Sequence, residues 1–343
     1  MQLTEKSRVG ILLQGGVKGH NGKTGLAFLR YSPTNVVAIV DSETAGESIA
    51  DLTQIERQVP IVRDVRAALK YQPEVFLIGI APSGGQLPEY LLTQIAIAIN
   101  AGISIINGLH TPLQNKFPNL QPGQEIWDIR QEPAGLSIAS GKARALTAAR
   151  ILTVGTDMAI GKMSTSLELH RAATARGIES QFVATGQAGI AIAGMGLALD
   201  AVRVDFAAGA VEKTVLELGA DCNLVIIEGQ GSLLHPGSTA TLPLIRGSQP
   251  TSLVLVHRAG AAHIRDLPDF LIPPLPEVVR LYETVARNTF TAVKVKAIAL
   301  NTFGLDDESA TAAILSVRDL TGLPCSDVVR FGGASLLSAV LDE

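Results

Sequence analysis

The sequence is poor in cysteine. Of its 343 residues only two are cysteines, Cys222 and Cys325, and they lie far apart in the chain. This number excludes a disulfide-dense secreted scaffold, and the absence of any Cys-x-x-Cys pair argues against a structural zinc site. A large chain with two cysteines and a polar, signal-free start predicts free thiols and a cytoplasmic location.

Aromatic and charged residues are also scarce, at 4% and 17% of the chain. The core must therefore be aliphatic and alanine-rich, and long disordered tails are not expected. The net charge is −4, with both signs mixed along the sequence, so there is no basic patch for nucleic acid or an anionic membrane. No apolar run reaches the ~20 residues of a membrane-spanning helix. The expected partner is a small molecule.

Short β-branched runs alternate with longer alanine- and leucine-rich segments, a pattern typical of parallel βαβ units. Strands are expected at residues 8–13, 36–40, 74–78 and 103–106, and again at 150–154, 181–184, 223–227, 252–256 and 294–300. Helices are expected at residues 63–71, 88–101, 162–176, 206–218, 276–288 and 306–320. The sequence predicts an α/β protein of two domains. A Rossmann-like parallel sheet (residues 1–110) leads through a connection (111–149) to a P-loop NTPase-like parallel sheet (150–343).

The most specific motif lies at residues 154–165, between an expected strand and an expected helix, where a P-loop belongs. Its glycines let backbone N–H groups converge on an anion, and the helix N-terminus adds positive potential. The predicted cofactor-binding residues are Gly155, Thr156, Asp157, Ile160, Gly161, Lys162, Met163, Ser164 and Thr165.

The motif departs from the usual P-loop in two ways. Five residues separate Gly155 from Gly161, where four are usual. Met163 stands where a hydroxyl normally follows the lysine, so Ser164 is the residue that we expect to contact Mg²⁺ if a metal binds.

The P-loop half resembles dethiobiotin synthetase and related ATP-dependent enzymes, through Gly155-Thr156-Asp157, Gly161-Lys162 and the acidic segment Glu228-Gly229-Gln230-Gly231. Nearly the whole chain resembles a bacterial family long classed as of unknown function, whose members have been described as D-glutamate N-acetyltransferases that use acetyl-CoA. That resemblance also rests on Gly22-Lys23-Thr24-Gly25, Asn107-Gly108-Leu109-His110, Thr185-Gly186-Gln187-Ala188-Gly189 and Asp205-Phe206-Ala207-Ala208-Gly209.

Further site residues are expected at the carboxyl ends of the strands, where open α/β sheets bind ligands. The candidates for a catalytic base are Glu228, Asp205 and His235. Each also has a structural explanation: a strand-end carboxylate that caps backbone, a helix N-cap and a solvated loop histidine. The substrate-binding candidates are Lys23, Asn107, His110, Gln187 and Arg258.

A second glycine-rich turn, at residues 15–24, mimics the P-loop spacing. We interpret it as a loop that meets the ligand and not as a second P-loop. Asp41 stands where a Rossmann acid meets a ribose hydroxyl, but no clean Gly-x-Gly-x-x-Gly precedes it.

Three hypotheses remain open. The preferred one is acetyl transfer from acetyl-CoA to the amine of a small acidic amino acid, with the P-loop holding CoA phosphates. An ATP-dependent ligase or kinase that uses Mg²⁺ is the alternative, and a non-catalytic nucleotide-binding regulator is the third. The alanine- and glycine-rich segment at residues 188–198 suggests a homo-oligomer.

Overall fold

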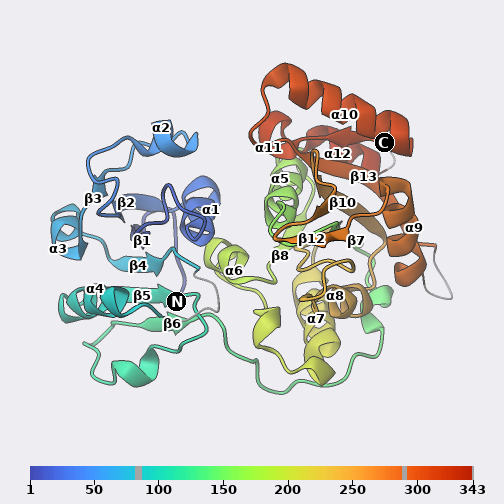
Figure 1. Ribbon diagram of the computed structural model, residues 1–343. Helices are drawn as coiled ribbons and strands as arrows, with labels where there is room; N and C mark the ends of the chain where they lie inside the picture. The colour runs from blue at the N-terminus through green and yellow to red at the C-terminus, as the bar shows by residue number, and fades with distance from the viewer. Residues whose placement is uncertain (82–86, 288–291, 342–343) are drawn as a thin grey trace. The chain divides into compact units, whose positions relative to one another are not determined.

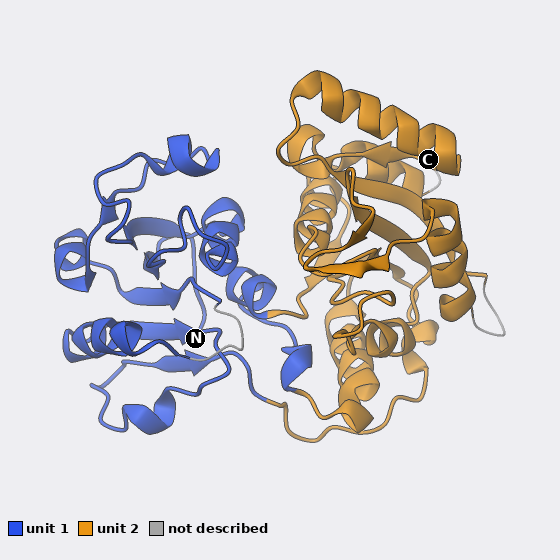
Figure 2. Ribbon diagram, viewed as in Figure 1, with its two compact units in different colours: residues 1–131, 187–201 blue, residues 132–186, 202–343 orange. Residues whose placement is uncertain are grey.

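The computed structural model describes residues 1–81, 87–287 and 292–341 (Figure 1). The chain forms two compact units (Figure 2). Unit 1 comprises Met1–Gln131 and Gln187–Ala201, and unit 2 comprises Glu132–Gly186 and Val202–Glu343. Both cysteines are free, as predicted. No helix in the described part of the chain is long and apolar enough to cross a membrane.

Unit 1 is built on a six-stranded sheet of order β3-β2-β1-β4-β5-β6. Its strands are β1 (Arg8–Leu12), β2 (Asn35–Val40), β3 (Ile61–Val62), β4 (Val75–Ile78), β5 (Ser104–Asn107) and β6 (Ile126–Asp128). Every pair is parallel, and the order is that of a Rossmann sheet, with its switch point between β1 and β4.

The helices of unit 1 are α1 (Lys23–Tyr31), α2 (Ile49–Thr53), α3 (Val65–Ala68), α4 (Glu89–Asn100) and α6 (Gln187–Ala193), with 3₁₀ turns η1 (Leu69–Tyr71), η3 (Gln114–Lys116) and η5 (Leu199–Ala201). Helix α1 packs close to the sheet because Gly25 and Gly79 lack side chains. A Cβ atom on Gly79 would lie 2.9 Å from the Cα atom of Gly25.

Unit 2 is built on a second six-stranded sheet, of order β14-β13-β10-β7-β9-β8. Its strands are β7 (Ala149–Gly155), β8 (Ser180–Val183), β9 (Leu224–Ile227), β10 (Ser252–Arg258), β13 (Lys294–Asn301) and β14 (Cys325–Ser326), all parallel. A separate antiparallel hairpin consists of β11 (His263–Ile264) and β12 (Leu267–Leu271). The predicted fold class, two α/β domains with parallel sheets, is therefore confirmed.

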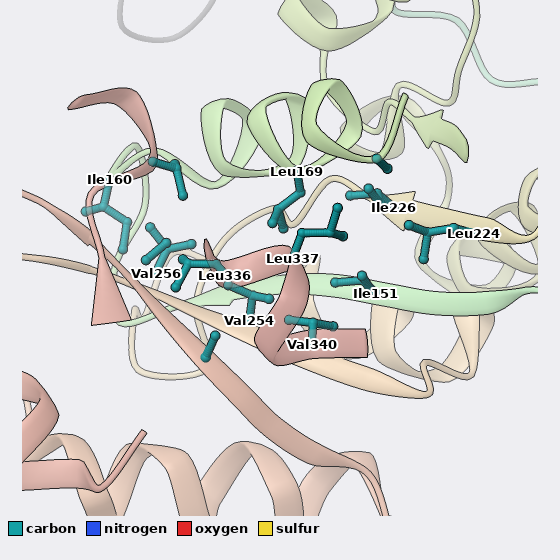
Figure 3. Close-up of a cluster of buried hydrophobic side chains, with 14 residues drawn as sticks. Ile151, Ile160, Leu169, Leu224, Ile226, Val254, Val256, Leu336, Leu337 and Val340 are labelled. Atoms are coloured by element: carbon teal, nitrogen blue, oxygen red, sulfur yellow. The ribbon is translucent and has the colours of Figure 1, made fainter. Parts of the chain in front are cut away.

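The helices of unit 2 are α5 (Lys162–Ala175), α7 (Val204–Gly219), α8 (Thr241–Ser248), α9 (Leu275–Ala286), α10 (Asp307–Thr321), α11 (Val328–Phe331) and α12 (Ala334–Leu341), with the 3₁₀ turn η4 (Lys142–Ala145). Figure 3 shows the aliphatic cluster on one face of the sheet. Leu169 of α5 and Leu336 and Leu337 of α12 pack there against strand residues that include Ile151 and Val254. This cluster fixes α5, and with it the loop that leads into α5.

The boundaries of the two units differ from the domain boundaries predicted from the sequence. The predicted connection at residues 111–149 contains β6, which pairs with β5 and belongs to the first sheet. The segment Gln187–Ala201, which follows β8 in the chain, belongs to unit 1, where α6 contacts α1. The predicted end of the helix at residue 288 lies outside the described residues.

Candidate functional site

The P-loop joins β7 to α5 in unit 2. Its backbone takes left-handed conformations at Ala159 (φ 53°) and Gly161 (φ 115°). As a result, the N–H groups of residues 159–164 turn away from the chain's own carbonyls, and within the described residues they have no hydrogen-bond acceptor. Successive unpaired amides at the start of a 14-residue helix form a cradle of the kind that can bind an anion.

Lys162 is buried inside this loop, with 6% of its surface exposed. Its Nζ atom donates a hydrogen bond of 2.6 Å to the carbonyl oxygen of Asp157. The aliphatic stem lies over Gly155 and Gly229, since a Cβ atom on either glycine would come within 3.2 Å of it. Burial lowers the pKa of Lys162 to about 8, while the nearby carboxylates of Asp157 and Glu228 act in the opposite direction. An anionic ligand would favour the charged form of this lysine.

Side chains from other elements brace the loop. The hydroxyl of Tyr282 in α9 donates to the carbonyl of Gly155 at 2.6 Å, and the Nδ2 atom of Asn301 donates to the carbonyl of Ile160 at 2.9 Å. The hydroxyl of Thr156 lies 2.9 Å from the Nδ1 atom of His257. Burial lowers the pKa of His257 to about 4, so its ring is neutral at physiological pH. The cradle is thus held in place by its surroundings.

The hydroxyls that follow Lys162 have different environments. Thr165 donates to the carbonyl of Gly161, and Ser166 donates to that of Lys162. The hydroxyl of Ser164, the predicted Mg²⁺ contact, makes no hydrogen bond within the described residues. The side chain of Met163 has no hydroxyl. No group of three or more His, Cys, Asp or Glu residues in the described chain could hold a metal ion.

Glu228 stands at the end of β9, next to the P-loop strand, and is buried. Its Oε2 atom accepts the N–H groups of Thr185 and Gly186 at 2.9 and 3.2 Å, and its Oε1 atom accepts a 3.0 Å hydrogen bond from Gln230. Burial raises its pKa to about 7, although these hydrogen bonds and the charge of Lys162 oppose the shift. The carboxylate therefore orders the loop after β8 and titrates near neutral pH.

The other two base candidates lie elsewhere in unit 2. Asp205 is exposed in the first turn of α7, where the N-cap position belongs to Arg203. His235 lies in the loop after β9, and its Nδ1 atom accepts the N–H of Gly237 at 3.0 Å. In a neutral ring with that bond, the proton is on Nε2, which then acts as a donor.

Two of the substrate-binding candidates, Arg258 and Gln187, differ in the interactions that their side chains make within the protein. Arg258 is exposed at the end of β10, beside the P-loop strand, and its guanidinium makes no hydrogen bond or ion pair within the described residues. Gln187 opens α6 in unit 1, and its Nε2 atom donates weakly to the hydroxyl of Thr24 at 3.4 Å.

The remaining candidates belong to unit 1. Asn107 is fully buried and holds the turn after β5, through hydrogen bonds to Asp128 and to the Leu109 amide. His110 is exposed and lies 3.0 Å from Arg130, and burial and that guanidinium both lower its pKa. Lys23 is exposed at the start of α1.

Asp41, considered for a ribose contact, is fully buried. It accepts the amides of Gly15 and Glu43 and the hydroxyl of Thr44. This carboxylate therefore anchors the glycine-rich turn.

Comparison with known families identifies both halves of the chain. The description "Domain of unknown function (DUF1611_C) P-loop domain" matches residues 137–337, and "Domain of unknown function (DUF1611_N) Rossmann-like domain" matches residues 42–132. The chain belongs to the DUF1611 family. The chain is similar to a DUF1611 family protein from Anabaena variabilis whose crystal structure is known, with 59% sequence identity and a TM-score of 0.96. The match covers 98% of this chain and 100% of the Anabaena protein.

Two curated relatives carry a functional name, D-glutamate N-acetyltransferase. The one from Tritonibacter scottomollicae is 36% identical over 78% of this chain and 81% of its own length. The one from a Pseudoalteromonas species is 36% identical over 79% and 82%, respectively.

Several residues that surround the DUF1611 P-loop cannot be recognised from the sequence. Tyr282 and Arg265 come from segments more than a hundred residues along the chain, and no local motif marks either of them. The backbone N–H of Arg265 donates to the carboxylate of Asp157 at 2.8 Å, which attaches the β11–β12 hairpin to the P-loop. Only the fold brings these groups together.

Proposed function

We propose that this DUF1611 protein is an N-acyltransferase that moves an acetyl group from acetyl-CoA to the amine of a small acidic amino acid of the D-glutamate type. The names of the two curated relatives support the reaction class. One observation in the structure carries the proposal. The unpaired amides of residues 159–164 surround the buried Lys162 and suit the phosphates of CoA.

The hydroxyls beside Lys162 also support acyl transfer over phosphoryl transfer. Those of Thr165 and Ser166 donate to backbone carbonyls, which leaves the hydroxyl of Ser164, and Met163 stands in the place of the usual metal-binding hydroxyl. A cradle of amides and one lysine binds phosphate without needing a metal, whereas phosphoryl transfer places Mg²⁺ on such a hydroxyl.

In the transfer, the nitrogen lone pair of the neutral amine forms the N–C bond to the acetyl carbon, and the C–S bond breaks. The ammonium proton goes to a base, and the departing thiolate of CoA takes up a proton, so the products are the N-acetyl amino acid and free CoA. Glu228, Asp205 and His235 are the candidates for this base, and a pKa of about 7 suits Glu228 to proton transfer at neutral pH. Three donors already approach its carboxylate, which has about four acceptor positions and can therefore accept one more hydrogen bond.

The alternative, an ATP-dependent ligase or kinase, is favoured by one feature: Glu228 ends the strand next to β7, close enough to Lys162 for their charges to interact. An acid in that position can bind Mg²⁺ beside a P-loop.

Calorimetric titration with acetyl-CoA, and separately with Mg-ATP, distinguishes the two functions. We expect wild type to bind acetyl-CoA and Lys162→Ala to lose about a hundredfold in affinity, equivalent to about 3 kcal/mol for a buried charge-assisted contact. Lys116→Ala, which removes an exposed lysine in unit 1, is the matched control. Acetyl transfer to D-glutamate is measured through the free thiol of CoA that the reaction releases. Binding of Mg-ATP without binding of acetyl-CoA would overturn the acyltransferase proposal.

A further inference from the structure

A cavity of about 260 Å³ lies in unit 2 on the flank of the P-loop. Its walls come from the P-loop, the loop after β9 and the turn of the β11–β12 hairpin. The lining residues are Asp157, Met158, His235, Arg265, Asp266 and Leu267. The volume is below the roughly 300–1,000 Å³ of pockets for drug-sized ligands. It is too small for a whole coenzyme and suits a molecule about the size of an amino acid.

The hairpin turn that forms one wall is held by the P-loop itself. Asp157, 5% exposed, accepts the Met158 amide through Oδ1 at 2.6 Å and the Arg265 amide through Oδ2 at 2.8 Å. Ile264 is fully buried and anchors the strand before the turn, while Asp266 closes the turn in a left-handed conformation with φ 65°. The backbone of Arg265 is therefore fixed, although its side chain is exposed.

The polar groups of the cavity have both signs of charge. The Nε atom of Arg265 lies 3.6 Å from Asp266, a loose and exposed pair that a ligand can replace. His235 offers Nε2–H as a donor, since Nδ1 accepts from Gly237. Asp157 has acceptor positions left after its two backbone hydrogen bonds. A ligand with an amine and carboxylates matches this set better than a simple anion, which the two aspartates would repel.

We propose that this cavity is the acceptor subsite and takes an amino dicarboxylate, whose carboxylates pair with Arg265 and His235 and whose amine faces Asp157 and Asp266. This inference rests on the proposed acyltransferase function, because the cavity adjoins the loop that would hold the acetyl donor. Leu267 and Met158 give the methylene carbons of such a ligand an apolar contact.

The test uses Arg265→Ala, because the backbone of this residue, and not its side chain, anchors the hairpin. We expect the Kd for D-glutamate, measured by calorimetry, to rise about tenfold or more, as the loss of one charge-assisted pair implies. The Kd for acetyl-CoA should stay within about twofold. Arg265→Lys should recover only part of the affinity, since lysine cannot bind a carboxylate bidentately. Arg280→Ala removes an exposed guanidinium from α9 and is the matched control.

The outcomes separate this inference from the proposed function. An unchanged Kd and KM for D-glutamate in Arg265→Ala, with acetyl transfer intact, would overturn the cavity assignment and leave the acyltransferase standing. Weakened D-glutamate binding in the variant, with no acetyl transfer by wild type, would support the cavity and overturn the acyltransferase. Wild type that neither binds nor acetylates D-glutamate would overturn both.

Discussion

The two glycine-rich loops look alike in sequence, but different atoms fill them. The glycine-rich turn at residues 15–24, which follows β1 and is called the first loop below, is filled by its own backbone. A Cβ atom on Gly22 would lie 2.0 Å from the carbonyl oxygen of Gly16. In the P-loop (residues 155–162, after β7), a Cβ atom on Gly155 would meet the side chains of Ile160 and Lys162, and the nearest atom to one on Gly161 is 3.7 Å away. The two loops therefore differ in the space that they enclose, and we expect an anion to bind in the P-loop and not in the first loop.

The largest effects are expected when one glycine in each loop is replaced by alanine. Gly22→Ala should destabilise unit 1 by about 3 kcal/mol, because the new methyl meets a backbone carbonyl that cannot move aside. Gly161→Ala has room for the methyl but must keep φ 115°, which costs about 1–3 kcal/mol and distorts the cradle. Urea unfolding measures the first effect, and acetyl-CoA titration the second. If the two variants lost the same unfolding free energy and Gly161→Ala still bound acetyl-CoA as wild type does, the proposed difference between the loops would be wrong.

The next prediction concerns the carboxylate that anchors the first loop. Asp41→Ala removes three acceptor contacts of a fully buried group and should cost about 2 kcal/mol in unfolding free energy. The affinity for acetyl-CoA should not change, because this anchor serves unit 1. Asp51→Ala, at an exposed aspartate in the first turn of α2, is the control. A large loss of acetyl-CoA affinity in Asp41→Ala would show that the first loop takes part in donor binding.

A third prediction concerns pH, because the P-loop surroundings hold two buried groups that titrate near neutrality. The pKa of Glu228 is raised to about 7, so the folded state holds this proton more tightly than the unfolded state does. Its contribution to stability is present below about pH 4.5 and is lost as pH rises through 7. The pKa of Lys162 is lowered to about 8, so its contribution is present above about pH 10.5 and is lost as pH falls through 8.

Two measurements check this pH dependence. Unfolding free energies should fall between pH 4.5 and 7 in wild type and much less in Glu228→Gln, whose side-chain oxygen can still accept the Thr185 and Gly186 amides. Binding of acetyl-CoA at pH 8.5 should take up protons, because an anion beside Lys162 raises its pKa. Calorimetry in buffers of different ionisation enthalpy detects this uptake. Equal heats in all buffers would argue against an anion beside this lysine.

The sequence predicts the sheets and the P-loop because these depend on local patterns. Buried parallel strands need β-branched runs, and a phosphate loop needs glycines before a helix, so β7 and α5 are expected within a residue or two of where they lie. The sequence does not predict β6, because three residues among prolines and glutamines give no periodic signal. Some partners of Asp41, Asn107 and Glu228 cannot be predicted either, because only the fold brings them close. Asp41 and Glu228 accept backbone amides from distant segments, and Asn107 donates to the side chain of Asp128.

The smallest expected effect concerns Lys23, the counterpart of Lys162 in the first loop. Because its side chain is exposed, any pair that it makes with a substrate carboxylate is worth at most about 1 kcal/mol. Lys23→Ala should therefore raise the KM for D-glutamate by no more than about fivefold and leave the Kd for acetyl-CoA unchanged. Steady-state kinetics at low and high salt provide the measurement, since screening should abolish a surface ion pair. A hundredfold loss of acetyl-CoA affinity would instead make the two lysines equivalent, and the packed backbone of the first loop would then have to open to admit a phosphate.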